Sequence, residues 1–132
     1  MTFPRTMALA LLVLAGMMLN PDAATAQPTG KMQQFVYVLR LTPKYHDQAR
    51  WTDKDNAAVG RHFERLSKGV EAGYVVFAGR TREPLDKTFG LVVFEAESES
   101  AARAFMESDP AVEAGVMTAT LHPYALALQR KN

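Results

Sequence analysis

Cysteine is absent from this chain of 132 residues, which excludes disulfide bonds, thiolate metal sites and a lipid anchor attached through an N-terminal cysteine. A large excess of one charge is also missing, because 15 lysines and arginines stand against 14 aspartates and glutamates. We therefore expect no surface for nucleic acid. The glycine-rich phosphate loop, the GxSxG turn and the HExxH helix motif do not occur either. These absences remove the common nucleotide-binding, hydrolase and zinc-protease signatures, and we predict no metal and no cofactor.

Long hydrophobic runs are scarce, and the one that is present lies at the N-terminus. Residues 7–19 are apolar but short for a membrane span, and Arg5 gives the segment a positive start. Residues 24–26 (Ala-Thr-Ala) offer the small side chains that a signal peptidase reads. We predict a secretory signal peptide over residues 1–26 and a product that is exported to the periplasm or secreted, with no membrane attachment after cleavage. An uncleaved membrane anchor is the alternative.

The rest of the sequence has the length of one small domain. We place this domain at residues 34–130, behind a flexible lead at residues 27–33. Aromatic and β-branched runs predict four strands, at residues 35–41, 74–78, 89–95 and 118–128. Amphipathic patterns predict two helices, one from a capping box at 52–55 to Gly69 or Gly73 and one over residues 98–108. The order β-α-β-β-α-β predicts an α+β, ferredoxin-like fold with a four-stranded antiparallel sheet and both helices on one face.

The predicted strands are apolar on both faces. In the first strand Tyr37 and Leu39 point one way and Val36 and Val38 the other, and residues 91–94 are a continuous apolar run. An antiparallel sheet with one face in water alternates instead between apolar and polar residues. Two apolar faces need two covers, and the helices supply one. The second cover would be another subunit or a large apolar ligand surface. We predict a homodimer in which the two sheets pack face to face. Pro123 in the last strand requires an edge position or a bulge.

Two residues in the helical part are candidates for proton transfer. His62 lies at the border of the apolar stripe of the first helix, where a side chain can reach both a cavity and water. Its titration range makes it a natural proton shuttle near neutral pH, although a histidine without a role is the simpler interpretation. Asp109 ends the second helix just before a proline, which is also a common helix stop. A carboxylate beside His62 would orient its ring.

Two charged residues are candidates for substrate binding. Arg80 follows the second strand and would bind an anionic substrate at the sheet edge, with a solvated loop arginine as the alternative. Glu71 is a rival carboxylate nine residues after His62, and only a helix break near Gly69 would bring the two together. We therefore rank Glu71 below Asp109. His122 and His62 have no spacing that is typical of metal ligands.

Five segments together resemble the YCII-related (YciI-like) family: residues 35–41 (FVYVLRL), 62–66 (HFERL), 71–81 (EAGYVVFAGRT), 89–96 (FGLVVFEA) and 109–115 (DPAVEAG). The resemblance implies a dimeric α/β barrel built on the ferredoxin-like motif. It also implies an enzyme with a histidine–aspartate pair at its catalytic centre. That pair would fall on His62 and Asp109, although relatives have aspartate at the position of Glu71. The export signal departs from relatives that are cytoplasmic.

These observations support two functions of different classes. The first is a small cofactor-free enzyme in which His62 acts as general base or acid, Asp109 orients it and Arg80 fixes an anionic group. Elimination or isomerisation of a small cyclic or aromatic molecule is the chemistry that such a pair can perform. The alternative is a non-enzymatic, exported dimer that binds a small ligand or assists another protein. A monooxygenase-like activity on the same barrel is a third possibility that no residue here requires.

Overall fold

The computed structural model describes residues 30–131, so the expected signal peptide (1–26) and the first part of the expected lead (27–29) lie outside the described residues. One antiparallel sheet contains four strands in the order β2-β3-β1-β4. The strands are β1 (Gln33–Leu41), β2 (Val75–Arg80), β3 (Phe89–Ala96) and β4 (Met117–Pro123). The helices are α1 (Asp53–Ala72), α2 (Glu99–Glu107) and the short α3 (Pro110–Glu113).

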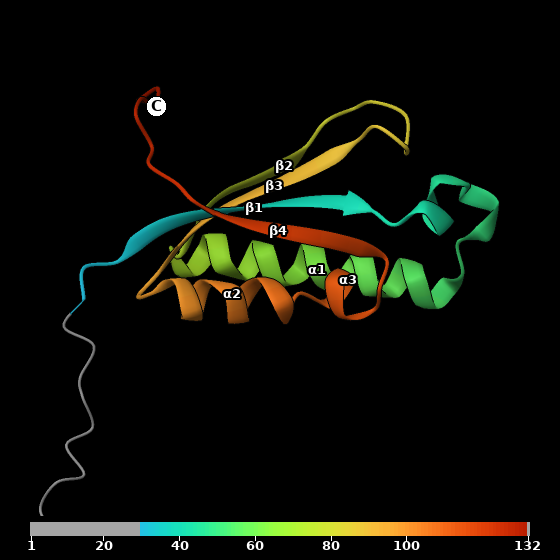
Figure 1. Cartoon of the computed structure of the whole chain (residues 1–132), viewed down its shortest axis with the longest axis horizontal. Helices are drawn as coiled ribbons and strands as arrows, with labels where there is room; N and C mark the ends of the chain where they lie inside the picture. The colour runs from blue at the N-terminus through green and yellow to red at the C-terminus, as the bar shows by residue number, and fades with distance from the viewer. Residues whose placement is uncertain (1–29, 132) are drawn as a thin grey trace, which may run out of the picture.

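All three helices lie on one side of the sheet (Figure 1). The elements follow the chain order β-α-β-β-α-β, and β1 has two antiparallel neighbours, β3 and β4. This arrangement confirms the predicted ferredoxin-like α+β fold. None of the helices within residues 30–131 is long and apolar enough to cross a bilayer.

Helix α1 begins and ends where its local signals predict. The Thr52 side chain accepts a hydrogen bond from the Asp55 N–H, and the Asp55 carboxylate accepts one from the Thr52 N–H at 2.9 Å. Gly73 ends the helix in the left-handed conformation with φ of 86°, which glycine adopts without a steric cost. Gly69, the other predicted stop, lies inside the helix. A Cβ atom there would overlap the Val75 side chain, so glycine lets α1 lie close against β2.

The core lies between the sheet and the helices. The inward-facing residues of β1 pack against β3 and the helices, and the buried members of this cluster include Phe35, Tyr37, Leu39, Leu66, Phe94 and Met106. Phe105 of α2 adds an aromatic contact to Phe94, with ring centroids 4.7 Å apart. This packing fixes α1 and α2 over the centre of the sheet.

The prediction for the last strand was wrong at its end. β4 is an edge strand, as Pro123 requires, but it stops at that proline and does not reach Leu128. The physical reason is that its partner β1 begins at Gln33, so no strand is left to pair with beyond the bond from the Tyr124 N–H to the Gln34 carbonyl. The residues after Asp109 form α3 instead of a simple stop. Residues 43–50, between β1 and α1, contain two short 3₁₀ turns, η1 (Pro43–His46) and η2 (Gln48–Arg50).

The outer face of the sheet, opposite the helices, is apolar at its centre. The strand register places Val36 and Val38 of β1 beside Val93 and Leu91 of β3 on this face. Arg40, Glu95, Thr118, Thr120 and His122 follow at its periphery by the same alternation. No helix of the described chain covers this face (Figure 1). A second subunit on it stays a prediction.

Candidate active site

His62 lies in the middle of α1, on the part of the helix that turns toward the sheet. Leu66, one turn after His62, is buried in the core, whereas Phe63, the next residue after His62, is 73% exposed. The side chain of His62 is 13% exposed and therefore sits at the boundary between core and solvent. This is the border position that the helical pattern predicts.

Asp109 reaches the same place from a separate element. It is the N-cap of α3, and its Oδ1 atom accepts a hydrogen bond from the Ala111 N–H at 2.9 Å. Pro110 stands at the first helical position, where a missing N–H costs nothing. The side chain of Asp109 is completely buried. The Asp-Pro sequence is thus a helix start, and it turns the carboxylate into the protein.

The two side chains are in contact. His62 Nδ1 lies 2.7 Å from Asp109 Oδ2 and 2.9 Å from Oδ1. An ionised carboxylate only accepts hydrogen bonds, so Nδ1 is the nitrogen that carries the proton. In the neutral ring the lone pair then resides on Nε2. Within residues 30–131 no side chain or backbone group bonds to Nε2, which leaves this nitrogen free to take up a proton.

Tyr37 is a third member of this group. Its hydroxyl donates a hydrogen bond to Asp109 Oδ2 at 2.8 Å, and its side chain has no solvent exposure. The ring stands edge-on to Phe94, with centroids 5.6 Å apart, which fixes its direction. Burial and then the negative charge of Asp109 raise the pKa of Tyr37 far above its ordinary value of 10.0, so the hydroxyl remains a donor.

The carboxylate of Asp109 is held in its charged form. Burial by itself would raise its pKa, but the hydrogen bond and charge of His62 oppose this, together with the Tyr37 hydroxyl and the Ala111 N–H. The balance leaves the pKa of Asp109 below its ordinary value. Asp109 is therefore ionised at neutral pH and able to stabilise a protonated His62.

His62 forms part of the wall of a cleft of about 920 Å³ between α1 and the sheet. This volume suits a small organic molecule. Most of the residues in its walls are apolar, and they include Leu39, Val59, Phe63, Leu66, Val70, Leu85 and Met117. Polar groups come from Gln48, Trp51, Asn56, Ser67, Thr88 and Arg80. The cleft thus combines an apolar surface with a few groups that can form hydrogen bonds.

The structure brings three of the four predicted site residues to this region. Arg80, at the end of β2, lines the cleft, and Asp109 supports His62 from behind. Glu71 lies in the exposed last turn of α1 and does not line the cleft, so Asp109 is the acid that contacts His62. His122 projects from β4 toward the outer face and is separated from His62 by the sheet.

Sequence reasoning missed Tyr37 as part of the site. Its ring is buried and its hydroxyl is bonded, in agreement with the strand alternation that points Tyr37 to the same side as Leu39. The chain separation of 72 residues between Tyr37 and Asp109 left no local signal that would name the partner.

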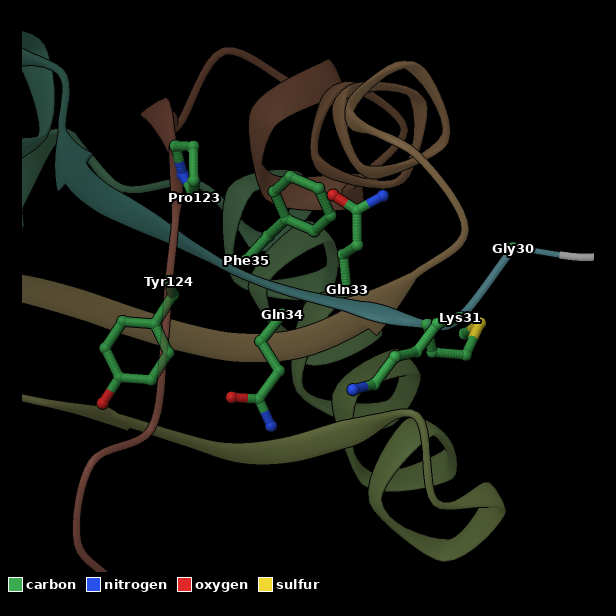
Figure 2. A pocket seen from close by; sticks show the side chains of 8 residues that line it. Gly30, Lys31, Gln33, Gln34, Phe35, Pro123 and Tyr124 are labelled. Carbon is green, nitrogen blue, oxygen red and sulfur yellow. The ribbon is translucent and has the colours of Figure 1, made fainter.

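A second pocket, of about 560 Å³, lies where β1 begins and β4 ends (Figure 2). Figure 2 shows Gln34 and Tyr124 on one side of β1 and Phe35 on the other. Among the residues that the structure describes, Lys31 is the only lysine or arginine in its lining, and no histidine or carboxylate contributes to it. We therefore place no acid–base chemistry there.

Comparisons with known proteins agree with this architecture. The solved structure of 5-chloro-2-hydroxyhydroquinone dehydrochlorinase (TftG) from Burkholderia phenoliruptrix, in complex with 2,5-dihydroxybenzoquinone, is similar to this chain with a TM-score of 0.50 and 22% identity. The similarity covers 71% of this chain and 95% of that one. At this identity it shows the fold alone. A search of curated proteins found no match.

The family of the chain follows from its sequence. The model of the YCII-related domain matches residues 36–121, which run from the first strand to the last and contain His62, Arg80 and Asp109. Because this match covers well over half of its length, the chain belongs to the YCII-related domain family.

Proposed function

We propose that this protein is a small enzyme that transfers protons with His62 and Asp109 on a small cyclic or aromatic molecule bound in the α1–sheet cleft. The single observation that carries the proposal is the 2.7 Å contact between His62 Nδ1 and the buried Asp109 carboxylate, at the wall of a cleft of about 920 Å³. His62 is the catalytic residue, because it alone of the pair reaches the cleft. Asp109 is a positioning residue.

The reaction class follows from what the pair can do. Nε2 of His62 accepts a proton from a bound molecule, and Asp109 stabilises the imidazolium that forms. The same nitrogen then returns the proton to another atom, which is isomerisation, or keeps it while a leaving group departs, which is elimination. Neither step requires a cofactor.

The similar solved structure supports elimination as the first activity to test. The name of that protein describes the loss of hydrogen chloride from a hydroxylated aromatic ring, and its bound ligand is a planar six-membered ring. The largely apolar walls of the cleft in this chain suit such a ring. We therefore choose 5-chloro-2-hydroxyhydroquinone as the probe substrate.

The test compares chloride release from this probe by the wild type, His62→Gln and His46→Gln. A positioned general base contributes about 10²- to 10⁴-fold to rate, so we expect His62→Gln to lose activity by this factor. His46 is an exposed histidine of η1 outside the cleft, and its variant is expected to keep activity within about two-fold. Equal rates for wild type and His62→Gln above the uncatalysed rate would contradict the role of His62, and a wild-type rate equal to the uncatalysed rate would favour a non-enzymatic binding protein.

A further inference from the structure

The charged side chains that line the α1–sheet cleft are of one sign, which is positive. Arg80 is the only lysine or arginine in its walls, and no aspartate or glutamate of residues 30–131 lines it. Asp109 lies behind His62, and its carboxylate has no surface in the cleft because His62 and Tyr37 cover it. Its charge is matched by its three hydrogen-bond donors, whereas the positive charge of Arg80 stands at the cleft wall itself, where it would attract a ligand that carries negative charge.

The backbone directs Arg80 into this space. In the β2–β3 ladder Ala78 pairs with the buried Val92 and Arg80 pairs with Gly90, so Arg80 lies on the same side of the sheet as the helices. Gly90 has no side chain, and the Leu39 side chain lies beside it, since a Cβ atom there would be 3.4 Å from the Leu39 Cβ. Arg80 and Gly90 both line the cleft, so Arg80 stands next to the apolar surface of Leu39 on the sheet wall.

The guanidinium of Arg80 has no carboxylate partner. The four ion pairs among residues 30–131 involve Arg50, His62, Lys68 and Arg103. No hydrogen bond joins the Arg80 side chain to another described residue either. An arginine that lines an apolar cleft without a partner keeps its donors available for an external anion.

We propose that Arg80 is an anion-binding residue that holds a negatively charged oxygen of a planar ligand while His62 faces the same ligand from α1. This inference rests on the proposed function for the role of His62, and it extends that function by naming the substrate class. The ligand is a cyclic molecule with an ionised oxygen, such as a carboxylate or an enolate, attached to an apolar ring.

The arrangement also assigns a role to Arg80 during proton transfer. When Nε2 of His62 removes a proton from carbon next to a carbonyl group, the C–H bonding pair forms a carbon–carbon double bond. The carbonyl pair then moves to oxygen, which becomes an enolate. A guanidinium beside that oxygen stabilises the developing charge. When the carbonyl re-forms, the electron pair of the double bond can expel a leaving group with its bonding pair, which completes elimination. Alternatively, that pair can take the proton back from His62 at another carbon, which completes isomerisation.

Binding of two simple probes tests this assignment without requiring turnover. Benzoate carries an anionic oxygen on an apolar ring, and benzamide is its neutral isostere. Charge-assisted hydrogen bonds are worth about 1.5–3 kcal/mol, which corresponds to about 10- to 100-fold in affinity. We expect isothermal titration of the wild-type chain at pH 8 to show at least about 10-fold tighter binding of benzoate than of benzamide.

Two arginine variants provide the comparison. Arg80→Gln is expected to bind benzoate about 10-fold more weakly than the wild type, whereas Arg82→Gln is expected to bind within about two-fold, because Arg82 is also exposed but does not line the cleft. Chemical-shift changes at Phe63 and His62 should locate benzoate. The inference is overturned by equal affinity for the two probes, by absence of benzoate binding, by equal effects of the two variants, or by shift changes confined to other residues. Loss of turnover in His62→Gln tests the proposed function separately.

Discussion

The properties of His62 depend on residues that surround its partner and not on His62 alone. Asp109 receives hydrogen bonds from His62, from the Tyr37 hydroxyl and from the Ala111 N–H. These three donors select the charged carboxylate and direct it at Nδ1, which determines which ring nitrogen is protonated. A buried aromatic residue and a short helix thus fix the orientation and the tautomer of a side chain on another helix.

Removal of the Asp109 charge should lower stability in a way that depends on pH. Asparagine presents an N–H₂ group to a site that contains three donors, so we expect Asp109→Asn to lower the free energy of unfolding by about 1–3 kcal/mol at pH 7. The pKa of Asp109 lies below its ordinary value in the folded state, so its stabilisation is complete above the unfolded-state pKa of about 3.9. It is lost as pH falls through the folded-state pKa.

Urea unfolding of the wild type and Asp109→Asn from pH 7 to pH 3 measures this effect. The difference between the two proteins should shrink as pH falls from about 5 toward 3. Asp86→Asn, at an exposed carboxylate in the β2–β3 loop, serves as a control with an expected change within about 0.5 kcal/mol. A difference that grows between pH 5 and pH 3 would contradict the assignment of a stabilising carboxylate.

At the scale of the elements, α1 is a strong local structure that also forms one wall of the site. Its capping box, apolar stripe and terminal glycine agree with one another, and all act over a few residues. The positions of Val59, Phe63, Leu66 and Val70 relative to His62 follow from the helical repeat, so the α1 wall of the cleft is defined as soon as the helix forms.

Two glycines of α1 should respond to alanine in opposite directions. Gly60 is exposed in the helix interior with free space around it, so Gly60→Ala should raise the free energy of unfolding by about 1 kcal/mol. Gly73 has φ of 86°, where a Cβ atom is strained, so Gly73→Ala should lower it by about 1–2 kcal/mol. Chemical denaturation followed by circular dichroism measures both values. Changes of the same sign in the two variants would show that the helix end is not as described.

At the scale of the whole molecule, the sheet has one face buried under helices and another that is apolar at its centre. Val36, Val38, Leu91 and Val93 form this centre by register, and the same register adds Phe77 and Phe89 to the polar residues around them. Val93 is buried within the chain, whereas Phe77 is 42% exposed. Apolar side chains that gather on one uncovered face are typical of an interaction surface. The homodimer and the export of the chain both stay predictions.

A charge at the centre of the outer face should therefore separate the subunits. We expect sedimentation of residues 27–132 at about 10 µM to give a dimer, since an interface of about 800 Å² per subunit is ordinary for a stable pair. Val38→Asp should sediment as a monomer, whereas Ser100→Asp, which adds the same charge at the exposed start of α2, should stay dimeric. A wild type that sediments as a monomer would contradict the prediction.

Local and periodic interactions made much of this protein predictable from its sequence. The capping box, the alternation along β1 and the order of the elements depend on neighbours a few residues apart, and they led to the ferredoxin-like fold. The border position of His62 and the edge position of β4 followed from the same rules. The end of β4 did not, because it depends on where the distant β1 begins.

The choice among distant partners required the tertiary structure. Glu71 and Asp109 were both candidates for His62, and only the packing of α3 against α1 brings one carboxylate to 2.7 Å while the other stays on the surface. The partner of the Tyr37 hydroxyl and the place of Arg80 in the cleft wall also followed only from the tertiary structure. Such contacts join segments tens of residues apart, so they depend on how the helices and strands pack against one another and not on a pattern within one of them.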